Sequence, residues 1–113
     1  MKQKQAVYSE EVEALRGLLA VGERDAVTGP TLCAQLGDTL SGRTDDSRLR
    51  QLRYLVSLAH SEGLPVAGGD RGYFLATQVA DFQRYAERLR KQAQGLLEKA
   101  QHVERLEPCS EAA

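Results

Sequence analysis

The side chains with the clearest binding chemistry lie between residues 43 and 71, where arginines recur at short intervals. A guanidinium group can donate two parallel hydrogen bonds to a phosphate or to the edge of a guanine base, and glutamine, serine and tyrosine supply further polar contacts. The residues expected to contact phosphates or base edges are Arg43, Ser47, Arg48, Arg50, Gln51, Arg53, Tyr54 and Arg71.

The same segment carries as many acids as arginines, which allows a second interpretation. Residues 38 to 76 contain five arginines and five acids, namely Asp38, Asp45, Asp46, Glu62 and Asp70. The arginines could therefore pair with these acids on an ordinary solvated surface. Asp45 and Asp46 stand at the predicted start of a helix, where the helix dipole favours acidic side chains, so capping explains them better than a metal site does.

Residue patterns typical of an enzyme or a metal site are not expected in this chain. The sequence has no nucleophile motif, phosphate-binding loop or carboxylate pair, and His60 and His102 are isolated. Cys33 and Cys109 are too few for a disulfide framework and are expected to be reduced thiols. We predict a protein that is not an enzyme and that needs no cofactor or metal.

The overall charge restricts the kind of nucleic-acid binding that is possible. Fifteen Lys and Arg residues stand against 16 Asp and Glu residues, which gives a formal net charge of −1 and a pI of about 6.1. A protein that coats nucleic acid through bulk positive charge is therefore excluded, and any such binding must use a local basic surface. No apolar segment predicts a signal peptide or a membrane span, so we expect a cytoplasmic protein.

The elements that position these residues follow from caps, breakers and apolar spacing. Ser9 is a good N-cap for the first helix, and Thr28 with Pro30 is a strong signal for the start of the second. The third helix is capped by a residue between Thr44 and Ser47. The predicted elements are a helix from Ser9 to Gly22, a very short strand at Ala26–Val27, a helix from Thr28 to Gly37 and a helix from about residue 44 to Glu62, whose core face is Leu49, Leu52, Val56 and Ala59.

Two short apolar runs around a glycine-rich loop predict a β-hairpin. The runs are residues 64–67 and 73–76, and three glycines lie in the loop 68–72 between them. Tyr73 and Phe74 alternate across the second strand, so at least one of them is expected in the core. Helix, short strand, two helices and hairpin is the order of a winged helix-turn-helix domain, here over residues 1–77, in which the third helix enters the major groove of DNA.

Several runs resemble small bacteriophage-encoded winged-helix proteins. They are Arg50–Val56, Glu62–Val66, Gly72–Ala76 and Val79–Tyr85, and the resemblance covers roughly residues 27 to 106. The turn at Gly63–Leu64–Pro65 and the strand Gly72–Leu75 are also similar to the DNA-binding domain of biotin-operon repressors. The resemblance implies sequence-specific binding of double-stranded DNA, in transcription control or in recognition of a replication origin. A winged helix can also serve as a docking module for another protein, without binding DNA.

A long helix is predicted over residues 78–106, followed by a flexible tail at 107–113. Its apolar residues form a heptad seam with Val79, Ala86, Ala93 and Ala100 in one row and Phe82, Leu89, Leu96 and Val103 in the other. The first half could pack on the winged domain through Val79, Phe82 and Leu89. The distal part is expected to extend past the domain and to form a homodimer through Ala86, Leu89, Ala93, Leu96, Ala100 and Val103.

Overall fold

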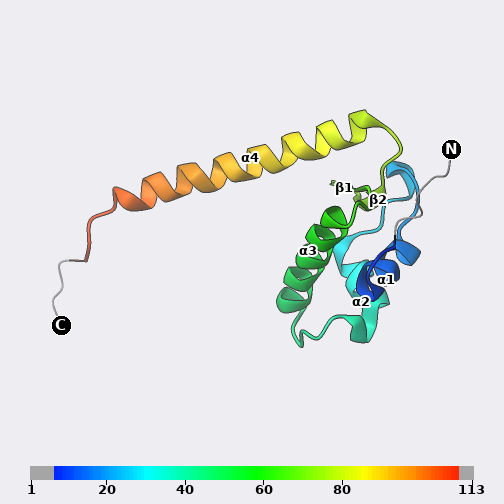
Figure 1. Cartoon of the computed structure of the whole chain (residues 1–113). Coiled ribbons are helices and arrows are strands. Elements are labelled where there is room, and N and C mark those ends of the chain that lie inside the picture. The colour runs from blue at the N-terminus through cyan, green and yellow to red at the C-terminus, as the bar shows by residue number, and fades with distance from the viewer. Residues whose placement is uncertain (1–6, 110–113) are drawn as a thin grey trace.

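A computed structural model describes residues 7–109 and shows a small helical body with a β-hairpin, from which one long helix extends (Figure 1). The α-helices and strands are α1 (Glu10–Leu18), α2 (Gly29–Leu36), α3 (Asp45–Ser61), β1 (Val66–Gly69), β2 (Gly72–Leu75) and α4 (Val79–Glu104), with single 3₁₀ turns at Glu23–Asp25 and Gly37–Thr39. This order confirms the predicted architecture of helices with a small hairpin and a long C-terminal helix.

The core lies between the first three helices and the start of the hairpin. The fully buried residues Val12 and Leu15 of α1 meet Leu32 of α2 and Leu52 of α3. On α3 the buried side chains are Leu52, Leu55, Val56 and Ala59. The observed core face of α3 differs slightly from the predicted one, since Leu55 is buried and Leu49 is only partly buried against the cluster.

Local signals fix the starts of α2 and α3. The Thr28 side chain accepts a hydrogen bond from the Thr31 amide at 3.4 Å, and Pro30 lies in the first turn of α2. In α3, Thr44 and Ser47 form a capping box: each side chain accepts a hydrogen bond from the other residue's backbone amide at 3.1 Å. Gly37 ends α2 with a φ of 51°.

The first helix departs from its predicted caps at both ends. The Ser9 side chain makes no hydrogen bond to its own helix; instead its hydroxyl donates to Glu62 Oε2 at 2.8 Å and its amide donates to Glu62 Oε1 at 2.6 Å. The helix ends at Leu18, four residues before Gly22. Gly22 instead starts a 3₁₀ turn, with φ at 89°, and its amide donates to the Leu75 carbonyl. Tertiary contacts therefore override both local signals.

The hairpin is tighter than the predicted loop and is held by a third segment. Antiparallel pairing runs from Val66 with Leu75 to Gly69 with Gly72, which leaves a two-residue turn of Asp70 and Arg71. The short strand expected at Ala26–Val27 is present as a bridge, in which Val27 and Tyr73 exchange two backbone hydrogen bonds of 2.8 Å. This third strand-like segment ties the hairpin of β1 and β2, called the wing below, to the start of α2.

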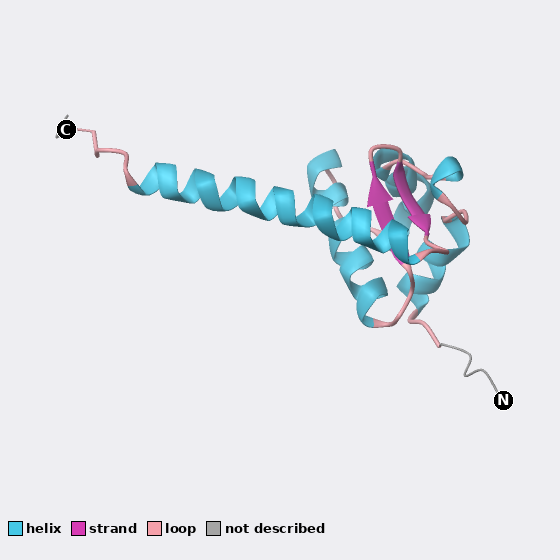
Figure 2. Cartoon of the chain, turned by 90° about the horizontal axis from the view of Figure 1, so that it is seen from above, coloured by secondary structure: helices cyan, strands magenta, loops and turns pink. Residues whose placement is uncertain are grey.

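The long helix α4 meets the body near its N-terminal end and then runs past it (Figure 2). The two aromatic residues of β2 both face inward: Phe74 is 3% exposed in a small cluster with Ala67 and Ala76, and Tyr73 packs partly buried against the main core. Tyr85 of α4 covers the Phe74 cluster. The predicted anchors Val79, Phe82 and Leu89 are instead 72%, 40% and 46% exposed.

Within residues 7–109, the apolar seam of the distal part of α4 has no contact partner. None of the 26 residues of α4 is buried, and Leu96 and Val103 are 69% and 54% exposed. The molecule is 68 Å long but only 33 and 26 Å across, as expected for a helix that extends beyond a small domain. Of the predicted tail, residues 107–109 are non-helical and 110–113 lie outside the described residues. Across residues 7–109, none of the helices combines the length and hydropathy needed to cross a membrane.

Candidate nucleic-acid interface

Four of the predicted arginines are exposed and unpaired. Arg50 and Arg53 lie on the outer face of α3, Arg43 lies in the loop before it, and Arg71 lies in the hairpin turn. No carboxylate of residues 7–109 lies within 4.0 Å of any of these guanidinium groups. Tyr54, on the same helix, is 71% exposed. These side chains therefore remain available to a ligand.

The acids that could have neutralised these arginines are occupied elsewhere or lie apart. Glu62 accepts two hydrogen bonds from Ser9, and Asp70 pairs with Arg88 of α4. The guanidinium of Arg88 lowers the pKa of the Asp70 carboxyl through a hydrogen bond and its positive charge. Asp45 and Asp46 occupy the first turn of α3. The interpretation of the arginines as one half of a set of surface ion pairs is therefore not supported for the described residues.

Arg48, predicted to contact DNA, is engaged within the chain. Its Nη1 donates to the carbonyls of Leu40 and Gly42 at 3.0 and 3.3 Å. Its Nη2 donates to the carbonyls of Cys33 and Gly37 at 2.7 and 2.9 Å. The guanidinium thus ties the C-terminal turn of α2 and the following loop to α3, and we remove Arg48 from the candidate interface.

Gln51 and Ser47 are also engaged within the chain. Gln51 Oε1 accepts a hydrogen bond from the Gly42 amide at 2.7 Å, and Gln51 Nε2 donates to Ser41 Oγ at 2.7 Å. Ser47 completes the capping box with Thr44. Both side chains fix the loop that leads into α3, so the free polar groups on the predicted face reduce to Arg50, Arg53 and Tyr54, with Arg43 at the helix entrance.

The structure adds a cleft that the sequence did not reveal, between α3, the hairpin and α4. Its polar lining includes Arg53, Ser57 and His60 of α3, Tyr73 of β2, and Arg88 and Gln92 of α4. Heptad spacing identified the apolar rows of α4, but it could not show that Arg88 would turn toward the wing, because that depends on how α4 packs. Two arginines from different helices therefore line one cleft.

Tyr73 is half-buried in this cleft. Burial raises the pKa of its phenol, and the positive charges of Arg53 and Arg88 act in the opposite direction. His60 lies in the last turn of α3. Its Nε2 is 2.8 Å from the Val66 carbonyl, to which it donates, and its ring lies 5.9 Å from that of Tyr85. His60 therefore links the last turn of α3 to strand β1.

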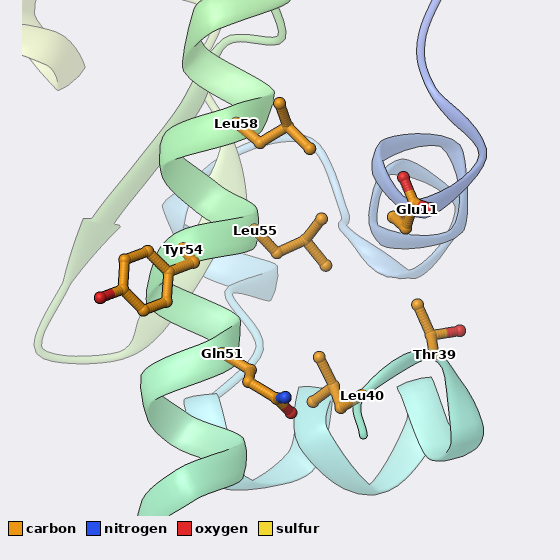
Figure 3. A pocket seen from close by; sticks show the side chains of 7 residues that line it. All are labelled: Glu11, Thr39, Leu40, Gln51, Tyr54, Leu55 and Leu58. Carbon is orange, nitrogen blue, oxygen red and sulfur yellow. The ribbon is translucent and has the colours of Figure 1, made fainter. Parts of the chain in front are cut away.

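A second hollow, apolar and separate from the arginines, lies between α1 and α3 (Figure 3). Leu55 and Leu58 point toward α1 across it, and the ring of Tyr54 points away. The residues that line it are Glu11, Thr39, Leu40, Gln51, Tyr54, Leu55 and Leu58. Its one charged group is acidic, so this hollow is unsuited to an anionic ligand.

Within residues 7–109, no three His, Cys, Asp or Glu side chains come together as metal ligands would. Cys33 is buried and Cys109 is exposed, and they do not form a disulfide with each other. Burial raises the pKa of the Cys33 thiol, which disfavours its reactive thiolate form. The arginine-bearing surface of α3, the wing and the adjoining cleft is therefore the strongest candidate site.

Comparisons with known protein families, curated proteins and solved structures find no match for this chain.

Proposed function

We propose that this chain is a sequence-specific double-stranded DNA-binding protein that acts in the cytoplasm, in transcription control or in recognition of a replication origin. The observation that carries the proposal is the set of exposed, unpaired guanidinium groups on α3 and the wing turn: Arg50, Arg53 and Arg71. In winged-helix proteins, these two elements face the groove and the flanking backbone. The resemblance to phage winged-helix proteins supports the same assignment.

The positions of the side chains suggest a division of roles. Arg50 and Tyr54 lie on the exposed face of α3, where an arginine reaches base edges and a hydroxyl reaches a phosphate or a base. Arg53 lines the cleft beside the wing, where it would neutralise a backbone phosphate, whereas Arg88 in the same cleft is paired with Asp70. Arg71, at the tip of the hairpin, would contact the flanking minor groove or backbone.

Two single substitutions test this division. Arg50→Ala is expected to weaken binding to a site selected from a random or genomic DNA pool by about 10- to 100-fold, because one bidentate base contact contributes about 1–3 kcal/mol of discrimination. Arg71→Ala should weaken binding to selected and random duplexes alike and lower the slope of log affinity against log salt by about one. Fluorescence anisotropy at several salt concentrations measures both effects.

The matched control is Arg16→Ala, which removes an exposed arginine that pairs with Glu13 on α1. It should bind DNA as the wild type does. Wild-type affinity of both the Arg50 and the Arg71 variant for the selected site would show that this face does not read DNA. Binding without any salt dependence, or no binding to any duplex, would favour the alternative of a protein-docking module.

We also propose that the protein acts as a homodimer through α4. Its apolar seam continues along the whole helix, yet the body covers only part of it near the N-terminal end. Pairing with a second copy would remove the remainder from water. A two-fold dimer also suits a DNA site with two-fold symmetry.

Leu96→Glu is expected to convert the dimer to a monomer, because it places a charge in the seam without touching the body. The control Gln101→Glu adds the same charge at an exposed position of α4 outside the two apolar rows. Sedimentation equilibrium at high micromolar concentration distinguishes the two. A monomeric wild-type protein under these conditions would remove the dimer from the proposal.

A further inference from the structure

The two flanks of the α4 seam are not equivalent. One flank consists of the residues just before the alanine row, Tyr85, Gln92 and Lys99, and the other of the residues just after the leucine row, Gln83, Arg90, Leu97 and Glu104. The first flank faces the body, because Tyr85 covers the Phe74 cluster and Gln92 lines the adjoining cleft. All four residues of the second flank are exposed.

We infer that two copies of α4 pair in parallel, an inference that rests on the proposed dimer. In a parallel two-fold pair, the flank before the alanine row of one helix faces the flank after the leucine row of its partner. The two bodies then lie on opposite sides of the pair and do not meet. In an antiparallel pair, like flanks face each other, so both bodies lie on the same side.

The size of the body argues against the antiparallel pair with the longest overlap. If all seam layers were in contact, Ala86 of one copy would lie opposite Leu96 of the other. Tyr85 of the two copies would then be 12 residues apart along the axis, which is about 18 Å at 1.5 Å per residue. Across its long axis the molecule measures 33 and 26 Å. Two bodies of about this size on the same side, each packed on α4 at Tyr85 and set only about 18 Å apart, would overlap.

The charges on the flanks favour the same orientation. In the parallel register, Lys99 of each copy faces Glu104 of the other, which gives two opposite-charge pairs across the seam. Both residues are exposed, and neither has an ion pair within residues 7–109. In the fully overlapped antiparallel register, Arg90 of one copy would lie beside Arg90 of the other, a like-charge contact that Glu87, 3.4 Å from Arg90 in each copy, would partly offset.

Disulfide trapping in the full chain tests the orientation. All variants carry Cys109→Ser, and the buried Cys33 is retained. Val103→Cys places one thiol in the leucine row near the end of α4. A disulfide needs Cα atoms within about 7 Å, which the parallel pair provides and the fully overlapped antiparallel pair, with these residues about 36 Å apart, does not. The control Gln101→Cys places the thiol on the outer surface of the same turn.

The expected result is that most of the Val103→Cys protein becomes a disulfide-linked dimer under mild oxidation, whereas Gln101→Cys stays largely unlinked. Cross-linking only when Val103→Cys is mixed with Val79→Cys or Ala86→Cys would show antiparallel pairing and overturn the inference. A monomer that cross-links in no combination would overturn it together with the dimer. None of these measurements involves DNA, so failure of the DNA-binding proposal would be seen separately in the anisotropy experiments.

Discussion

Arg48→Met is expected to lower the free energy of unfolding by about 3 kcal/mol or more. The charged guanidinium donates to several backbone carbonyls, and each hydrogen bond to a charged group contributes about 1.5–3 kcal/mol. Four carbonyls, from α2 and the loop that follows it, accept from this one side chain. Water would replace part of the loss, since Arg48 is half-buried. Methionine keeps the apolar stem and a high helix propensity, so the effect isolates the guanidinium.

Chemical denaturation of Arg48→Met beside Arg50→Met provides the measurement and its control. Arg50 lies on the exposed face of the same helix and makes no hydrogen bond to other described side chains or loops, so its replacement should change stability by no more than about 0.5 kcal/mol. The order is expected to reverse for DNA affinity: the Arg48 variant, where folded, keeps its DNA affinity, and the Arg50 variant loses it. A stable Arg48 variant with lost DNA affinity would return Arg48 to the interface.

Gly72→Ala is expected to destabilise the protein by about 3 kcal/mol, combining backbone strain of about 1–3 kcal/mol with disrupted hydrogen bonding. Gly72 has a φ of 115°, and a Cβ built there would lie 2.2 Å from the carbonyl oxygen of Val27. The clash falls on backbone atoms, so relief requires the wing to move away from Val27. That movement breaks the paired hydrogen bonds between Val27 and Tyr73.

The matched control is Gly17→Ala in α1, where a new Cβ meets no atom within 4 Å. This substitution should raise stability by about 0.5–1 kcal/mol, because alanine is the better helix former. Thermal and urea unfolding of both variants test the contrast. Wild-type stability of Gly72→Ala would mean that the wing is not tied to the segment before α2.

Several elements could be predicted from the sequence because their signals are local. Thr28 and Pro30 fix the start of α2, and Thr44 caps α3 through hydrogen bonds within a few residues. The hairpin and α4 follow in the same way from short-range patterns of apolar residues, glycine and strong helix formers. Ser9 shows the limit of such signals, because Glu62, 53 residues away, competes for its hydroxyl.

The candidate site was predicted less completely than the fold. An arginine on a helix has the same type and spacing whether it faces solvent, as Arg50 does, or a set of carbonyl groups, as Arg48 does. Only the path of the loop before α3 distinguishes the two. Likewise, the heptad pattern located Ala86 in the seam, but it could not show that Tyr85, one residue earlier, would anchor α4 to the hairpin.

The sequence by itself determined the order and type of the elements, the apolar seam of α4 and a cluster of arginines between residues 43 and 71, because each depends on residues close together in the chain. The tertiary structure decided which arginines remain free, which one holds the loop before α3, and that Arg88 of α4 joins Arg53 at the wing. Those outcomes depend on where carbonyls and carboxylates from distant segments come to lie, and packing alone sets those positions.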